Sequence, residues 1–118
     1  MYYKKKVGIS GEDIASAYLK QIGYNIIERN FNCRQGEIDI IAQDKNEIVF
    51  IEVKTRRNKK YGRAVEAVDI NKQRHLLNSI KFYIYLRKLN QRFIRIDVIE
   101  VYIKRNKIDI NHIKKAIE

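Results

Sequence analysis

Apolar residues recur every three or four positions in two stretches of the chain, and this spacing predicts two helices. The first helix begins at Ser10, or as early as Lys6, and ends at Ile22. Asp13 follows Ser10 at the spacing of an N-terminal capping pair. The second helix is longer and is predicted over residues 69–89.

Runs of Ile, Val, Phe and Tyr between turn residues predict the strands. We place strands at residues 24–29, 37–43, 48–55 and 92–103, with a short last strand at 107–113. The second and third strands form a hairpin around the sequence DKNE. The long helix then provides a crossover between strands. The pattern therefore predicts an α/β fold with a mixed central β-sheet flanked by helices.

The composition is that of one folded, strongly basic domain. No repeat, low-complexity tract or proline marks a linker, so residues 1–118 are expected to form a single domain. The chain has 25 Lys and Arg against 14 Asp and Glu, a net charge of +11. Such an excess indicates a polyanionic partner, with nucleic acid ahead of an anionic membrane surface.

Several classes of protein are disfavoured by the sequence. No apolar run approaches the ~18 residues that a membrane span needs, and the opening MYYKKKVGIS lacks the apolar core of a signal peptide. We therefore expect a cytoplasmic protein that does not bind membranes. Cys33 is the single cysteine, which excludes an internal disulfide and a multi-cysteine zinc site.

Charged residues interrupt the apolar hairpin strands at Glu37, Asp39, Glu52 and Lys54. Burying an unpaired charge is costly, so these side chains either lie at solvated edges or converge on a compensating group. Alternation places the two acids of the second strand on one face, and Glu52 shares a face of the third strand with Lys54. A loop of two or four residues puts Asp39 and Glu52 on the same side of the sheet, directly opposite each other in the four-residue case. A three-residue loop separates them.

Two carboxylates on the same side would repel each other unless a cation lay between them. A Mg²⁺ ion resolves this conflict, because it prefers oxygen ligands and binds one or two carboxylates with water and phosphate. Lys54 could then orient an attacking water and offset phosphate charge, and Glu12 is a third candidate acid. The alternative is that Asp39 and Glu52 are ordinary edge charges with Lys54 as their salt-bridge partner, since a D…ExK pattern is short enough to occur by chance.

Six motifs carry a resemblance to a known family: GEDIASAYLKQIGYNIIERNF, GEIDIIA, IEVKTRR, YGRAVEAV, KQRHLL and IRIDVIEV. Over residues 11–101 they resemble the YraN family, a widespread bacterial group of endonuclease-like proteins. That family is similar to the PD-(D/E)XK nuclease superfamily and, within it, to archaeal Holliday junction resolvases. The resemblance implies a restriction-endonuclease-like α/β core that hydrolyses phosphodiester bonds with a divalent metal ion.

The resemblance also implies roles for individual residues. Asp39 and Glu52 match the two acids of the signature, and Ile38 stands where the named signature has proline. The implied cofactor is Mg²⁺ or Mn²⁺. The implied catalytic residues are Glu12, Asp39, Glu52 and Lys54, and the implied metal ligands are Glu12, Asp39, Glu52 and the main-chain carbonyl of Val53.

A basic segment directly follows the predicted catalytic strand and is the best-placed phosphate clamp. Its cations are Arg56, Arg57, Lys59, Lys60 and Arg63, with Arg34 in the preceding turn as a further candidate. No recognition helix for base readout is evident, so we expect recognition of backbone or structure, in DNA that is branched or forms a junction. Because junction resolvases act as dimers, the resemblance favours a homodimer.

Three functions compete at this point. The first is a metal-dependent endonuclease acting on DNA, and the second is a non-catalytic nucleic-acid-binding module with a nuclease-like fold. The third is a protein-interaction domain whose charge serves solubility. The intact set of Asp39, Glu52 and Lys54 favours the first, because a binding module has no need to retain all three residues.

Overall fold

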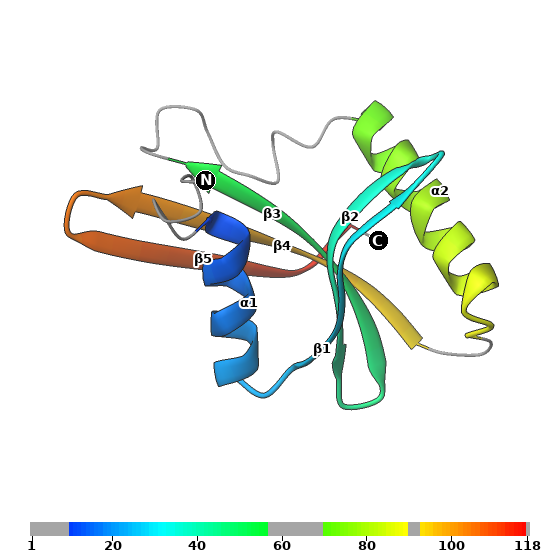
Figure 1. Cartoon of the computed structure of the whole chain (residues 1–118), viewed down its shortest axis with the longest axis horizontal. Helices are drawn as coiled ribbons and strands as arrows, with labels where there is room; N and C mark the ends of the chain where they lie inside the picture. The colour runs from blue at the N-terminus through cyan, green and yellow to red at the C-terminus, as the bar shows by residue number, and fades with distance from the viewer. Residues whose placement is uncertain (1–9, 57–69, 90–92, 118) are drawn as a thin grey trace, which may run out of the picture.

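The computed structural model describes residues 10–56, 70–89 and 93–117 of the chain (Figure 1). Each helix and strand predicted from the sequence has a counterpart in these ranges. In chain order the elements are α1 (Gly11–Gln21), β1 (Asn25–Cys33), β2 (Gly36–Asp44), β3 (Glu47–Arg56), α2 (Ile70–Leu86), β4 (Phe93–Lys104) and β5 (Lys107–Ile117). Neither α1 nor α2 is long and apolar enough to cross a membrane.

The strands form one sheet in the order β1-β2-β3-β4-β5. Neighbours pair antiparallel except β3 and β4, which are parallel. Parallel neighbours need a crossover connection, and α2 lies in that connection. The prediction of an α/β fold with a mixed sheet flanked by helices is confirmed.

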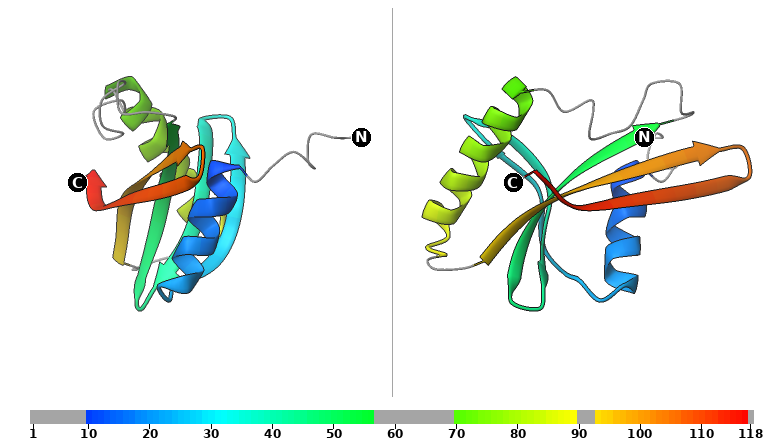
Figure 2. Two further views of the ribbon diagram at one scale, coloured as in Figure 1. Left: turned by 90° about the vertical axis from the view of Figure 1, so that its left-hand side faces the viewer. Right: turned by 180° about the vertical axis from the view of Figure 1, so that it is seen from behind.

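Each helix covers its own face of the sheet, as the turned views show (Figure 2). Alternation along β3 supplies both cores, because Val49 and Ile51 pack under α1 while Ile48 and Phe50 pack under α2. Residues from α1 in the first core are Ala15 and Leu19, and those from α2 in the second are Leu76, Ile80 and Tyr83. An even-numbered residue of β3 that is charged therefore belongs to the α2 face.

Three elements end more than one residue away from the predicted position, and one of them is the second helix, predicted over residues 69–89 and observed over Ile70–Leu86. Helix α1 begins as predicted, with Ser10 and Asp13 forming a capping box. The first strand, predicted to end at Arg29, runs on to Cys33, because β1 pairs with β2 as far as Cys33 opposite Gly36. The last strand, predicted as short, runs to Ile117 because its partner β4 is long.

A two-residue turn sets the register of the β2–β3 hairpin. Lys45 and Asn46 form the turn, and Asp44 pairs with Glu47 on either side of it. Lys45 has a φ of +58°, the left-handed conformation that tight hairpin turns use. The loop therefore has an even number of residues, and the register equals that expected for a four-residue DKNE loop. Asp39 and Glu52 share the α2 face.

A buried polar network joins β4 to the rest of the molecule on the α1 face. Asp97 is fully buried, and its Oδ1 accepts a hydrogen bond from Arg95 Nε at 2.9 Å. The same guanidinium reaches the carboxylates of Asp44 at 3.2 Å and Glu47 at 2.6 Å, beside the hairpin turn. Asp97 Oδ2 also lies 2.7 Å from Nε2 of His112 on β5. The network thereby links four neighbouring strands, β2 to β5, and its ion pairs compensate the buried charges.

Candidate active site

The candidate site lies where β2 and β3 separate. Their ladder ends with Ile40 opposite Ile51, after which β2 stays paired with β1 and β3 stays paired with β4. Asp39 is the next residue on β2, and its Oδ2 accepts a hydrogen bond from the main-chain N–H of Val53 at 2.8 Å. This side-chain bond replaces the missing ladder bond and holds the carboxylate between the separating strands.

A cavity of about 350 Å³ occupies this fork. That volume has room for roughly ten water-sized molecules. One wall comes from β2 and β3 and the other from the N-terminal half of α2. The lining residues are Gly36, Glu37, Asp39, Glu52, Val53, Lys72, His75 and Leu76.

The two predicted signature acids, Asp39 and Glu52, both have raised pKa values. Burial raises the pKa of Asp39 to about 6, and the nearby charge of Glu52 adds to the shift, against the lowering effect of the Val53 N–H. Burial likewise raises the pKa of Glu52, although Lys54 and Lys72 oppose it. Each carboxyl group therefore holds its proton to a higher pH than an exposed one, as expected for buried acids.

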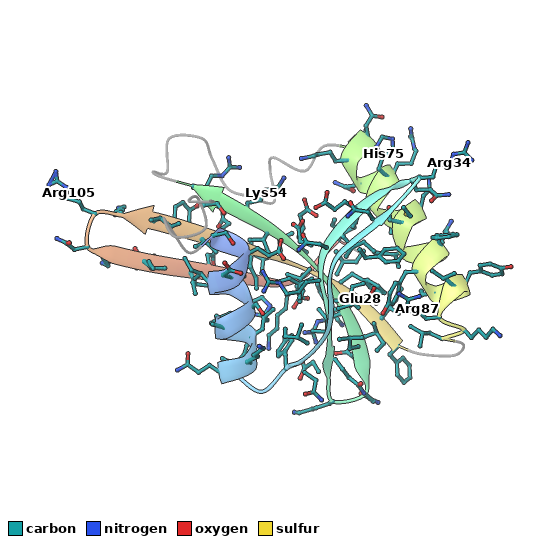
Figure 3. The ribbon with its side chains drawn as sticks, in the orientation of Figure 1. Glu28, Arg34, Lys54, His75, Arg87 and Arg105 are labelled. Atoms are coloured by element: carbon teal, nitrogen blue, oxygen red, sulfur yellow. The ribbon has the colours of Figure 1, made fainter. Side chains whose placement is uncertain are left out.

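Lys54 lies beside the cavity on the same face of β3 as Glu52. Its Nζ is 3.5 Å from Glu52 Oε2, and its side chain is 17% exposed. Burial lowers the pKa of Lys54, and Lys72 lowers it further, while Glu52 opposes the shift. Figure 3 shows Lys54 on β3 and His75 on α2, both toward the upper edge of the molecule. Lys54 is thus placed beside the second signature acid, as predicted from alternation.

Glu12 occupies a different position from the other predicted ligands. It lies in the first turn of α1, where its Oε2 accepts hydrogen bonds from Arg29 Nε at 2.8 Å and Asn30 Nδ2 at 3.0 Å. Glu12 does not line the cavity, but its charge contributes to the raised pKa of Asp39. The structure therefore brings Asp39, Glu52 and Val53 together and leaves Glu12 nearby, bound to basic and amide partners.

The predicted phosphate clamp is described only in part. Arg57, Lys59, Lys60 and Arg63 lie outside the described residues. Arg56 is the last residue of β3, and its Nε and Nη2 are buried without a hydrogen-bond partner in the described part of the chain. Buried guanidinium nitrogens without a partner are candidates for binding an anion. Arg34 is exposed in the β1–β2 turn, next to the N-terminal half of α2 (Figure 3).

Sequence reasoning gave no role in the site to three polar residues of the cavity. Glu37 is one of them, although alternation already places it on the same strand face as Asp39. Lys72 and His75 stand three positions apart, so they lie on one side of α2. Helical spacing alone does not say which sheet residues that side meets, so neither could have been assigned to the site.

The oxygen atoms of the described residues that line the cavity are too few to fill the coordination shell of a metal ion. Within the described residues no three His, Cys, Asp or Glu side chains converge closely enough to hold a metal ion by themselves. The two converging carboxylates remain, with the main-chain carbonyl of Val53 on the same lining. Mg²⁺ and similar ions often bind through one or two carboxylates, with water and substrate phosphate as the other ligands. The donor set fits such an ion.

Comparison with known proteins places the chain in a family. The model of the uncharacterised protein family UPF0102 matches residues 11–101. A UPF0102 protein of Caldicellulosiruptor saccharolyticus is 47% identical over 96% of this chain and 98% of its own length. A second, from Clostridium perfringens, is 44% identical over 97% of this chain and 95% of its own length.

One solved structure is also similar, although only distantly. The crystal structure of SSO0001 is 20% identical, over 89% of this chain and 48% of that one, with a TM-score of 0.33. This chain thus spans about half the length of that protein, and a likeness at this level carries no argument. The family model and the two relatives agree over almost the whole chain, which confirms the resemblance to the YraN group. The chain belongs to the uncharacterised protein family UPF0102.

Proposed function

We propose that this protein is a divalent-metal-dependent endonuclease that hydrolyses phosphodiester bonds in DNA. The observation that carries the proposal is the fork between β2 and β3, where Asp39 and Glu52 line one cavity and Lys54 lies 3.5 Å from Glu52. Ordinary edge charges would face solvent and would not share a half-buried cavity with raised carboxyl pKa values.

Each residue has a defined part in this proposal. Asp39 and Glu52, with the carbonyl of Val53, hold a Mg²⁺ or Mn²⁺ ion, whose chemistry is to polarise a phosphate oxygen and acidify a bound water. The Val53 N–H keeps the Asp39 carboxylate in place. Lys54 orients the attacking water and offsets the charge that develops on the phosphate. Glu12 adds a further acid once Arg29 and Asn30 release it.

Charge supports a nucleic acid as the substrate. The net charge of +11 on 118 residues favours a polyanion. Both helices of the described ranges pack a buried side against the sheet, so we expect binding through contacts to the nucleic-acid backbone. Branched and junction DNA are the structures that we expect to be preferred.

The test is a cleavage assay on linear, nicked and four-way-junction DNA with Mg²⁺ or Mn²⁺. The wild-type protein should cleave at least one of them, and EDTA should abolish cleavage. The Asp39→Ala and Lys54→Ala variants should each lose about 100-fold or more in rate, the usual cost of removing one stabilising group from an active site.

Matched controls are the exposed charges Asp109 and Lys81, outside the cavity. Asp109→Ala and Lys81→Ala should cleave like the wild type. Cleavage by Asp39→Ala and Lys54→Ala at the wild-type rate would rule out this site. If the wild type bound DNA tightly but cleaved none of the three substrates with either metal ion, a non-catalytic binding module would be the better description.

A further inference from the structure

The α2 wall of the cavity carries positive charge opposite the acids. Lys72 lines the cavity from the first turns of α2, and His75 lines it one turn later. Neither residue belongs to the acid-acid-lysine set that supports the proposed function. Lys72 is an exposed residue, so its role is not to fill the core.

Lys72 and Lys54 form a pair of like charges around one carboxylate. Lys54 Nζ lies 3.5 Å from Glu52 Oε2, and Lys72 lines the same cavity as Glu52. Lys54 extends from β3 and Lys72 from α2, so their ammonium groups flank the cavity from two different elements.

The charges around the cavity leave room for one more anion when a metal ion is bound. Among the described residues, Glu37, Asp39 and Glu52 bring three negative charges, and Lys54 and Lys72 bring two positive ones. A divalent cation turns the remaining single negative charge into a single positive one. A phosphodiester carries one negative charge and balances it.

We propose that Lys72 is a phosphate-binding residue, which together with Lys54 holds the phosphate group of the DNA strand in the cavity. This inference rests on the proposed function for its substrate, but it concerns binding and not hydrolysis. Lys72 approaches the phosphate from α2 and Lys54 from β3, so the phosphate is held between the two walls. A point charge on a flexible stem suits this task, because it follows the phosphate as it enters.

The experiment measures the affinity of a short duplex DNA by fluorescence anisotropy in Ca²⁺, with cleavage followed separately in Mg²⁺ or Mn²⁺. Lys72→Met should weaken binding about tenfold, the loss expected for one charge-assisted contact. Lys72→Arg should restore most of that affinity. The matched control is Lys81→Met, which removes the same charge from an exposed position of α2 outside the cavity and should change affinity less than about twofold.

A double-mutant cycle shows whether the two lysines share one phosphate. The effects of Lys54→Met and Lys72→Met on affinity should depart from additivity, whereas those of Lys54→Met and Lys81→Met should add. Equal affinities of the Lys72→Met and Lys81→Met variants, or no binding by the wild type, would overturn the role of Lys72. If Lys72 matters for binding while the wild type cleaves no DNA, the phosphate site stands and the endonuclease proposal fails.

Discussion

At the scale of single residues, Asp39 shows how one side chain serves both the backbone and the cavity. Its carboxylate replaces a missing ladder bond by accepting from the Val53 N–H at 2.8 Å, and it faces Glu52 across the separating strands. The same position is unfavourable for charge, because burial and Glu52 raise the pKa of Asp39 to about 6. Ionised Asp39 therefore lowers the stability of the folded protein at neutral pH.

Asp39→Asn should stabilise the metal-free protein at neutral pH. The pKa of Asp39 in the folded protein, about 6, is above the ordinary value of 3.8. The folded state therefore binds the proton more tightly, and stability falls as pH rises through that window. Asn keeps the acceptor for Val53 N–H and removes the charge. In EDTA at pH 7.5 the gain in unfolding free energy should be about 1–2 kcal/mol after allowance for solvent screening.

Urea denaturation in EDTA at pH 4.5 and pH 7.5 measures this difference, which should shrink at the lower pH. Asp109→Asn is the control, since Asp109 lies at the surface with a side chain 46% exposed. Added Mn²⁺ should stabilise the wild type and not the variant. An Asp39→Asn variant less stable than wild type at pH 7.5 in EDTA would contradict the account of its pKa.

At the scale of elements, the docking of α2 decides the shape of the cavity. Gly36 begins β2 with a φ of +149° and lies against α2, where a Cβ would come within 3.1 Å of Ser79 Oγ. At the other end of the helix, the carboxylate of Glu28 on β1 accepts hydrogen bonds from Arg87 Nη2 at 2.9 Å and from the Tyr83 hydroxyl at 3.2 Å. Figure 3 shows Glu28 beside Arg87. The β1–β2 hairpin is thus held to α2 at both ends.

Gly36→Ala should destabilise the protein in two ways, through its positive φ and through the contact with Ser79. We expect a loss of about 2–3 kcal/mol in a urea titration. Gly23→Ala separates the two causes, because Gly23 has a φ of +100° and nothing within 4 Å of the added Cβ. Gly23→Ala should therefore lose less, about 1 kcal/mol.

Ser79→Ala completes this comparison. Combined with Gly36→Ala it should recover part of the loss, because the crowded Oγ is removed. Combined with Gly23→Ala it should recover nothing. Recovery in both backgrounds, or in neither, would show that the approach of β2 to α2 is not the reason for glycine at position 36.

The elements also show what sequence could predict. Alternation along β2 and β3 was enough to group Asp39 with Glu37 and Glu52 with Lys54, because the period of a strand is fixed. The sequence leaves the register of the β2–β3 hairpin open, because loops of two, three or four residues are all compatible with DKNE. The cation wall was not predictable, because Lys72 meets the cavity only through the rotation of α2 on the sheet, which tertiary packing sets.

At the scale of the whole molecule, the network around Asp97 ties α1 to the strands of the sheet. Asp97 binds Arg95 and His112, and Tyr18 of α1 continues the chain with its hydroxyl 2.9 Å from His112 Nδ1. Burial alone would raise the pKa of Asp97, but the hydrogen bonds from His112 and Arg95 hold it below its usual value. The network therefore depends on an ionised Asp97.

Asp97→Asn should cost about 3 kcal/mol or more at neutral pH, because it leaves a buried guanidinium with one partner fewer. A folded pKa below the unfolded value means that the stabilisation is complete above the unfolded value, near 3.8, and is lost as pH falls through the folded pKa. Acid titration followed by circular dichroism should thus show a shallower decline for Asp97→Asn than for wild type. Asp109→Asn is again the control and should follow the wild-type curve, whereas a parallel decline of Asp97→Asn would contradict this role.

The contacts around the fork between β2 and β3 differ in how far apart their residues lie along the chain. Asp39 and Glu52 are 13 positions apart and meet across one two-residue turn, whereas Glu52 and its parallel neighbour Val98 are 46 positions apart. Closing the longer loop costs about 1 kcal/mol more in conformational entropy, and parallel pairing across a crossover is slow. The acids can therefore meet early in folding within a local hairpin, while the α2 wall joins them only when the crossover closes. The cavity is therefore complete only after the slow pairing of β3 with β4 has formed.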